Sequence, residues 1–459
     1  MRKNLFALMT FLVIASLVMS ACQTAATPAP TTEAPPPPPP TNTAIPPTAV
    51  PTQPPAPTDT PQPEGPPDLT GETITLYHFG DLSGPYAAIT APLIHGAEDA
   101  VKAVNEAGGI YGATLEIEFA DDAGNVDEAI AIYDRFTSGA DKPLLMITYG
   151  SGEAEALAQR FAEDKIVNVT AGLSAKAFYG AGSGYTFGLG PIYTDQLGMV
   201  MKFLVENWDT YKPASAGDEV KLAHLSWPTA FGQGSLTPES RAYLEELGVE
   251  IVAEETYDLS PTADTTTALL NAQAAGANVI WTNTLAFGPA ALLNGLNALG
   301  LRDQFVVTGD NWAMDLATYA FLSEPAYGVG LITPFPYLWW TDTDNPGVQY
   351  AQQLFEANER PNAEHNVGYL LLVAGVDLAV KAITHAIDTV GYENLNGEAI
   401  HAALIEMSPL EALDGVLKMD FSGDNRSPHV SQIRMIQGGP DAFNILQDWT
   451  DTPDLRPTE

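Results

Sequence analysis

The stretch Tyr149-Gly-Ser-Gly-Glu-Ala-Glu-Ala-Leu-Ala158 follows the strand-like run 144–148 and decides how this chain is organised. Two glycines flank Ser151, and an Ala-, Glu- and Leu-rich segment comes next. This order predicts a strand, a tight turn and a helix start, with Ser151 as the N-cap. Free backbone N–H groups and the helix dipole favour an anion there, and the glycines let it approach the backbone. The stretch therefore predicts a carboxylate site, although a serine that only caps its own helix fits the same residues.

Strand and helix patterns alternate on both sides of this stretch. Strands are predicted at 73–79, 114–119, 144–148 and 166–170, with helices at 92–107, 125–138 and 153–164. Such alternation is typical of a parallel sheet with helices on both faces, in which ligands bind beyond the carboxyl ends of the strands. We therefore expect the loops 80–86, 149–152 and 171–175 to converge.

The same pattern restarts after a helix predicted at 194–208. It includes strands at 220–225, 250–257, 278–282 and 304–308, whose following loops are 226–232, 283–287 and 309–312. Later helical runs at 347–358, 366–389 and 397–407 need a sheet to cover, so the chain is expected to return to the first lobe. The tail predicts short strands at 417–421 and 430–436.

The predicted fold class is therefore α/β, with two doubly wound parallel-sheet lobes joined by a three-crossover hinge. We expect lobe 1 at 71–192 and 331–412, lobe 2 at 193–330 and 413–446, and a flexible tail at 447–459. The crossovers are expected near 190–194, 328–332 and 410–416. A hinge between two strand-end faces makes a closing cleft.

The N-terminus has the pattern of a lipoprotein signal peptide. Residues 1–21 have a basic start, an apolar run and small residues before Cys22, which predicts cleavage ahead of a lipid-modified cysteine. Cys22 is the only cysteine, so a disulfide within the chain is excluded. An uncleaved membrane anchor or an ordinary signal peptide is the alternative, but the apolar run is short for a membrane span.

Residues 22–70 are predicted to form a disordered stalk on this lipid anchor. The segment is rich in Pro, Thr and Ala and contains a run of prolines at 35–40. It cannot bury a core, and an extended polyproline conformation would span roughly 100 Å or more. The stalk therefore predicts an extracytoplasmic protein tethered to the outer face of the cell membrane.

The charge balance excludes one class of partner. The 459 residues carry a formal net charge of −38 at pH 7. Such an acidic surface repels phosphate backbones, so nucleic-acid binding is not expected, and membrane contact must come through the lipid.

The motifs of the globular part resemble those of one known family. They are Leu82-Ser-Gly-Pro-Tyr86, Ala103-Val-Asn-Glu-Ala-Gly-Gly-Ile-Tyr-Gly112, Asp121-Asp122, Gly150-Ser-Gly-Glu153, Asp195-Gln196, Phe231-Gly-Gln-Gly234 and the helix at 369–382. Together they resemble the type I periplasmic-binding fold, specifically the branched-chain amino-acid (leucine/isoleucine/valine) binding subfamily of ABC-transporter substrate-binding lipoproteins. The resemblance covers residues 73–438. It implies a Venus-flytrap protein that traps a small amino acid, amide or carboxylate between its lobes and delivers it to ABC permease subunits.

The resemblance also implies ligand-binding residues in the first lobe. In that family, a serine after the third strand and groups of the loop after the fourth strand hold the ligand's α-carboxylate. The matching positions here are Ser151, Gly172 and Ser174.

The second lobe departs from the family pattern. Phe231 stands where a tyrosine is usual, Leu285 replaces another aromatic residue, and Asn311 replaces the acidic partner of the ligand's ammonium group. Asp310 lies one place away and is an alternative partner. If neither it nor Asp195 reaches the cleft, the expected ligand lacks an ammonium group. Further aromatic residues near strand ends, which either pack or contact ligand, are Trp227, Trp312 and Tyr86.

A catalytic set is not evident, so we do not expect an enzyme, a cofactor or a metal. Gly-x-Ser-x-Gly does not occur, and the seven histidines form no His-x-x-x-His pair. A monomeric solute receptor is the main hypothesis. A ligand sensor or envelope partner of the same fold and a surface hydrolase are the alternatives.

Overall fold

Two separate β-sheets organise the part of the chain that the computed structural model describes, which is residues 66–140, 142–440 and 442–457. The predicted signal peptide, Cys22 and the predicted stalk up to residue 65 lie outside these residues. The last residues of the predicted stalk belong to the folded part, because Leu69 is buried and its N–H donates to the Tyr111 carbonyl over 2.8 Å. The predicted bound of the stalk at residue 70 is therefore too late, because Leu69 already belongs to the folded part.

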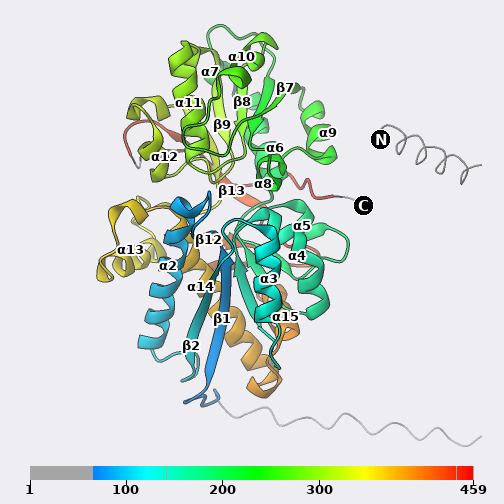
Figure 1. Ribbon diagram of the computed structural model, residues 1–459, viewed down its shortest axis with the longest axis vertical. Coiled ribbons are helices and arrows are strands. Elements are labelled where there is room, and N and C mark those ends of the chain that lie inside the picture. Colours follow the sequence, from blue (N-terminus) through cyan, green and yellow to red (C-terminus); the bar gives the residue numbers. More distant parts are fainter. Residues whose placement is uncertain (1–65, 141, 441, 458–459) are drawn as a thin grey trace, which may run out of the picture. The chain divides into compact units, whose positions relative to one another are not determined.

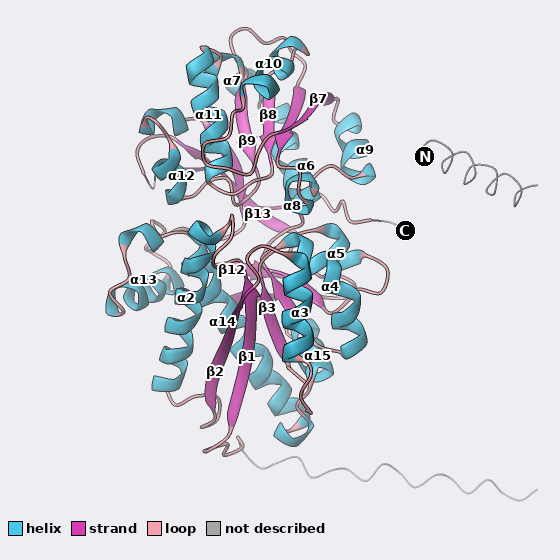
Figure 2. Cartoon of the chain, in the orientation of Figure 1, coloured by secondary structure: helices cyan, strands magenta, loops and turns pink. Residues whose placement is uncertain are grey.

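The first sheet has five parallel strands in the order β2-β1-β3-β4-β5. Their bounds are β1 (Thr73–Gly80), β2 (Thr114–Asp121), β3 (Leu145–Thr148), β4 (Val167–Thr170) and β5 (Thr186–Gly188). Helices cover both faces (Figures 1 and 2), namely α2 (Ala87–Glu106) and α14 (Val367–Val390) on one side and α3 (Val126–Phe136) and α4 (Ser151–Asp164) on the other. Alternation along β1 explains this, since Ile74 and Leu76 pack with one helix pair and Phe79 with the other.

The second sheet has seven strands in the order β14-β13-β10-β9-β8-β6-β7. Their bounds are β6 (Lys221–Ser226), β7 (Glu250–Thr256), β8 (Val279–Thr282), β9 (Val306–Gly309), β10 (Leu331–Phe335), β13 (Val430–Ile436) and β14 (Phe443–Asp451). Five of them are parallel, while β13 is antiparallel to β10 and β14 is antiparallel to β13. Helices cover both faces of this sheet as well. On one face, Leu222 and Trp281 pack toward α6 (Tyr193–Glu206) and α9 (Pro238–Glu246). On the other face, Ala223 and Ile280 pack toward α10 (Thr266–Ala274) and α11 (Phe287–Leu299).

The α/β class with two doubly wound lobes is confirmed, but several predicted boundaries differ from the structure. Residues 331–335 were expected to open the return to lobe 1, yet they form β10 of the second sheet. The predicted tail at 447–459 is also partly sheet, because β14 continues to Asp451 and pairs with β13. Lobe 2 therefore takes in residues 331–335 and the C-terminal strand.

The chain passes between the lobes three times. The first passage, between β5 and α6, lies where it was predicted. The second follows β10 and leads to α13 (Pro346–Ala357), so it comes later than 328–332. The third comes after Ser427, whose hydroxyl lies 3.3 Å from the Tyr179 hydroxyl of lobe 1, and not at 410–416. The hairpin of β11 (Leu410–Ala412) and β12 (Leu417–Met419) packs on α14, so the chain is still part of lobe 1 at these residues.

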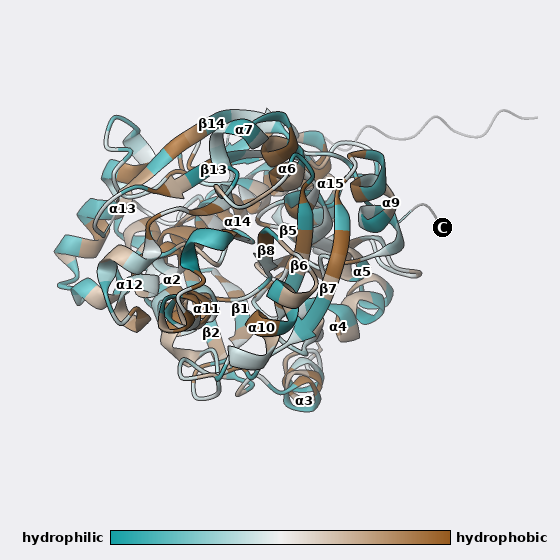
Figure 3. Ribbon diagram, turned by 90° about the horizontal axis from the view of Figure 1, so that it is seen from above, coloured by the Kyte–Doolittle hydropathy of each residue, from teal (hydrophilic) through white to brown (hydrophobic). Residues whose placement is uncertain are grey.

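The long apolar helix α14 is a core helix. Among the described residues it alone is long and apolar enough to cross a membrane, with 72% of its most apolar window buried. It packs along α2 and α15 (Gly397–Glu406). The hydropathy colouring in Figure 3 shows apolar residues on the strands and polar residues on the outer turns of helices such as α3 and α9.

The remaining elements are short. They are α5 (Ala175–Tyr179), α7 (Trp208–Tyr211), α8 (Ala230–Gln233), α12 (Leu316–Phe321) and the single 3-10 turns at Arg302–Gln304, Pro325–Gly328, Asn362–Glu364 and Tyr392–Asn394.

Candidate functional site

A cavity of about 220 Å³ lies at the carboxyl ends of the parallel strands of both sheets. Lobe 1 contributes the residues after β1, β2, β3 and β4, and lobe 2 contributes those after β6, β8 and β9. The predicted convergence of strand-end loops is therefore found here. Of the predicted ligand-binding residues, the cavity is lined by Tyr86, Ser151, Phe231 and Leu285, and the aromatic candidate Trp312 lines it as well.

Ser151 lies in the pocket, but it is not the N-cap of α4. Gly150 holds the N-cap position, with extended backbone at φ −78° and ψ 142°, and Ser151 is the first helical residue. The Ser151 hydroxyl is buried and lies 3.2 Å from the hydroxyl of Tyr193, which begins α6. The Ser151 side chain therefore does not cap the helix, and it lines the pocket from the first turn of α4.

Gly172 packs against the loop that carries Ser151. A Cβ at Gly172 would lie 2.7 Å from the carbonyl carbon of Gly150 and from the backbone nitrogen of Ser151. A side chain there would displace that loop, so the glycine lets the two loops touch. Gly172 itself is not part of the pocket lining.

Ser174 is engaged elsewhere. Its hydroxyl donates to Glu155 Oε1 over 2.5 Å, it is buried, and it does not line the pocket. Of the three residues that the family resemblance assigns to a ligand carboxylate, the structure therefore brings only Ser151 to the cavity.

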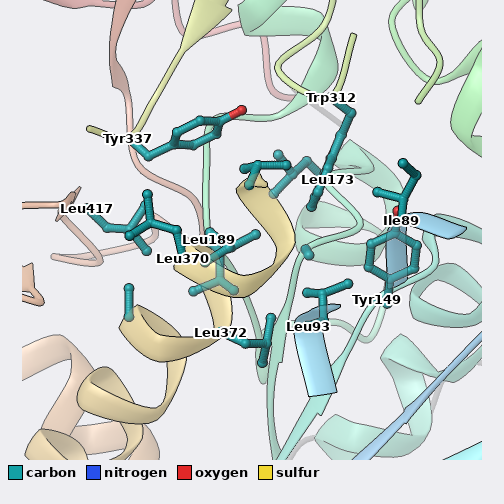
Figure 4. Close-up of a cluster of buried hydrophobic side chains, with 14 of the residues drawn as sticks. Ile89, Leu93, Tyr149, Leu173, Leu189, Trp312, Tyr337, Leu370, Leu372 and Leu417 are labelled. Carbon is teal, nitrogen blue, oxygen red and sulfur yellow. The ribbon is translucent and has the colours of Figure 1, made fainter. Parts of the chain in front are cut away.

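Aromatic rings form most of the wall. Five of them line the cavity, from both lobes: Tyr86, Tyr149, Tyr193, Phe231 and Trp312. Tyr149 and Trp312 meet edge to face, with centroids 5.5 Å apart, and Figure 4 shows them at one end of a buried apolar cluster. Burial raises the pKa of Tyr86 to about 12 and that of Tyr149 well above its usual value, so both phenols stay protonated at neutral pH.

Trp227 stands behind this wall. It is fully buried, and its ring centroid lies 6.1 Å from Tyr86 and 4.8 Å from Phe287. It does not line the cavity, so it supports the rings in front of it.

The predicted acidic partners from lobe 2 do not line the pocket. Asp310 is fully buried, neither of its carboxyl oxygens accepts a well-formed hydrogen bond, and burial raises its pKa well above the ordinary value. The Asn311 side chain accepts from Gln196 Nε2 over 2.9 Å, and its backbone N–H donates back to Gln196 Oε1. Asp195 binds His429 and the backbone of Leu455.

A carboxylate does reach the pocket, from lobe 1, so the position of Asp310 and Asp195 outside the lining does not by itself mean that the ligand lacks an ammonium group. Glu153 lines the cavity in the first turn of α4, and its carboxyl group lies so close to the Cα of Gly150 that a Cβ on that glycine would overlap it. Burial raises the pKa of Glu153, and the charge of Asp81 adds to this, while the backbone N–H of Glu153 acts in the opposite direction. The chain's own carboxylate therefore occupies the anion position at this helix start.

Two further carboxyl groups adjoin Glu153. Asp81 accepts from the N–H groups of Gly84 and Tyr86 over 2.5 and 2.7 Å. Asp122 is buried, and burial together with the charge of Glu153 raises its pKa to about 7. Glu153 therefore has two further carboxyl groups near it, and neither of them belongs to the pocket lining.

The lining residues that sequence reasoning did not select include Tyr149, Glu153, Tyr193 and Thr229. Tyr149 directly follows a strand, so the strand-end rule that selected Ser151 applies to it as well. Glu153 belongs to the Gly150-Ser-Gly-Glu153 motif, but the resemblance gives it no role in ligand binding, and Tyr193 and Thr229 carry no distinctive motif. Among the described residues, no group of three or more His, Cys, Asp or Glu side chains is arranged to hold a metal ion.

Comparison with known proteins agrees with this architecture. The chain is 25% identical over 374 residues to the Leu/Ile/Val-binding protein homolog 1 of Brucella suis biovar 1, covering 80% of this chain and 91% of that protein. It is 25% identical over 264 residues to an amino acid binding protein of Pseudomonas aeruginosa, covering 56% of this chain and 65% of that protein.

Solved structures show the same fold. A branched chain amino acid ABC transporter protein from Thermus thermophilus with bound valine superposes with a TM-score of 0.73 at 19% identity, over 84% of this chain and 98% of that one. A solute binding protein from R. palustris in complex with 4-hydroxybenzoate gives 0.67 at 18% identity, also over 84% and 98%. The family model described as "Periplasmic binding protein" matches residues 73–440, and the chain therefore belongs to the periplasmic binding protein family.

Proposed function

We propose that this chain is the solute receptor of an ABC importer. It traps a small amino acid, or a related amide or carboxylate, in the pocket between its lobes and delivers it to the permease. Cys22 carries a lipid that anchors the receptor to the outer face of the cell membrane, and the stalk gives the receptor its reach.

One observation carries the proposal: the pocket draws its walls from strand-end loops of both sheets. A ligand there touches both lobes at once, so it favours the arrangement in which they meet. At about 220 Å³ the cavity lies below the roughly 300–1,000 Å³ of sites for drug-sized molecules, which suits a small metabolite. The relatives named for Leu/Ile/Val or amino acid binding support the same ligand class.

The receptor carries no catalytic arrangement that we can derive from the pocket. Ser151 has a tyrosine hydroxyl beside it and not a histidine base, and the pocket-lining residues include no histidine. A binding function needs only the shape, the polar groups and the hinge that the described residues supply.

A thermal-shift screen of amino acids, amides, short carboxylates and urea tests the proposal. A ligand at 100 times its dissociation constant stabilises the fold by about 2.7 kcal/mol. Small-angle scattering with the ligand that emerges should show a smaller radius of gyration, because the lobes close on it. Failure of every compound to stabilise the protein would contradict the receptor function.

A pair of variants makes the screen specific to this pocket. Ala230 lines the cavity, so Ala230→Trp should fill it and abolish the stabilisation. Ala156 is exposed on α4 and outside the lining, so Ala156→Trp should leave the stabilisation intact. Equal behaviour of the two variants would place the binding site elsewhere.

A further inference from the structure

Among the described residues, the pocket lining carries a single charged residue, which is acidic. That residue is Glu153, and among the lining residues there is no Lys, Arg or His. We propose that the group this pocket recognises is a positive charge, namely the ammonium of an amine or small amino acid or a quaternary ammonium, held between the Glu153 carboxylate and the surrounding aromatic rings. This inference rests on the proposed function and narrows its ligand class.

The position of Glu153 is the first argument. Its carboxyl group lies against Gly150 at the N-terminus of α4, where a ligand carboxylate would otherwise bind. A second anion at the same helix start would meet the Glu153 charge at close range in a site largely shielded from water, and such repulsion is costly there. A cation in front of Glu153 is attracted instead.

The lack of a counter-charge is the second argument. None of the ion pairs formed by the described residues includes Glu153, Asp81 or Asp122. Buried charges in proteins are ordinarily paired, and here the raised pKa of Asp122, to about 7, reflects burial and the nearby charge of Glu153. A ligand cation supplies the missing partner.

The aromatic wall is the third argument. The faces of aromatic rings attract cations, and a cage of several rings is a recurrent way to bind quaternary ammonium groups. Five aromatic rings line this cavity. Tyr149 and Trp312 come from opposite lobes, and the ring centroids of Tyr193 and Phe231 lie 5.2 Å apart. The buried Tyr149 hydroxyl also has no hydrogen-bond partner among the described residues.

A four-compound binding series tests the charge directly. Isobutylamine and tetramethylammonium carry a positive charge, isobutyramide is neutral, and isobutyrate is negative. We expect the two cations to bind the full-length protein in calorimetry, and isobutyrate not to bind.

Glu153→Gln removes the charge and keeps the shape. It should weaken binding of both cations about tenfold or more and change binding of isobutyramide less than about twofold. The variant is expected to fold, because glutamine has nearly the same size and shape as glutamate and Glu153 takes part in none of the ion pairs formed by the described residues. The control is Glu163→Gln, which removes the same charge from an exposed position three turns along α4, roughly 15 Å away by helix rise, and should leave cation binding unchanged.

The outcomes separate the two proposals. Binding of isobutyrate or isobutyramide without binding of either cation would overturn the charge assignment and leave the receptor function standing. Cation binding that survives Glu153→Gln undiminished would also overturn it. No binding by any of the four compounds, together with a failed thermal-shift screen, would overturn both.

Discussion

The ring of Tyr149, at the end of β3, meets the ring of Trp312, beyond β9, at an interplanar angle of 74°. The two residues come from different sheets, so their contact joins the lobes across the pocket. The Tyr149 hydroxyl is buried without a partner, which is a costly state for a polar group unless a ligand completes it.

Tyr149→Phe keeps this ring contact and removes the hydroxyl. We expect ligand affinity to fall by about two- to tenfold, since one neutral hydrogen bond contributes about 0.5–1.5 kcal/mol. The ligand-free protein should be no less stable than the wild type in urea, because an unsatisfied buried group is lost. An unchanged affinity in calorimetry would show that the hydroxyl does not contact the ligand.

Ser151→Ala tests the residue at the start of α4. The side chain faces the pocket and does not cap the helix, so affinity should fall two- to tenfold while stability changes by less than about 1 kcal/mol. A loss of roughly 10- to 150-fold would be the size of a charge-assisted bond and would show that Ser151 holds a charged ligand group. Calorimetry and urea unfolding on the same variant measure both quantities.

Asp310→Asn should leave ligand affinity within about twofold of the wild type. The residue is fully buried and does not line the pocket, so it has no direct contact with the ligand. Stability at pH 7 should not fall, because the substitution removes a carboxyl group that burial already disfavours in its charged form. A tenfold loss of affinity would instead make Asp310 the partner of the ligand's ammonium group.

Asp122 should impose a pH dependence on stability. Its pKa is raised to about 7 in the folded state from an ordinary value of 3.8, so the folded state binds more protons between these values. The free energy of unfolding therefore falls as pH rises from about 4 to about 7. Asp81 and Glu153 adjoin Asp122 and contribute to the shift.

The variant Asp122→Asn isolates this effect, because an amide oxygen can still accept from the Gly124 N–H. It should match the wild type near pH 4 and exceed its stability by on the order of 2–4 kcal/mol at pH 8. Urea unfolding across this range measures the difference, and parallel curves for the two proteins would refute the assignment.

Cys22→Ser should release the protein from the membrane. The lipid is predicted to be the only anchor, and the stalk separates it from the binding site. After fractionation we expect the variant in the soluble fraction with unchanged ligand affinity. Retention in the membrane after signal cleavage would contradict a lipoprotein.

The alternation of strand and helix patterns was enough to predict the α/β class and where a pocket would lie. The pattern did not predict β10, because this strand contains Pro334 and a proline ordinarily argues against a strand assignment. In the fold β9 pairs only with Leu331 and Ile332, so the proline ring lies beyond that ladder. The strand β14 was missed because it is an edge strand that only its partner β13 makes recognisable.

The site was harder to predict because distant partners decide what each side chain does. Ser174 has the residue type and the sequence position that the resemblance requires, but its hydroxyl donates a hydrogen bond to Glu155. Asn311 is likewise held by Gln196, 115 residues away in sequence. The opposite holds for Glu153: the sequence gives it no binding role, but the fold places it in the lining of the cavity between the loops of both lobes.

The C-terminal segment is hydrogen-bonded to α6, next to the passages between the lobes. Asp195, fully buried in the first turn of α6, accepts the Leu455 N–H over 2.8 Å and lies 3.0 Å from Nδ1 of His429, on the third passage between the lobes. If the lobes close on ligand as proposed, a fluorophore attached near the C-terminus would lie beside the passages between the lobes, where its surroundings would change on closure. For a biosensor built on this scaffold, that end is a suitable labelling position.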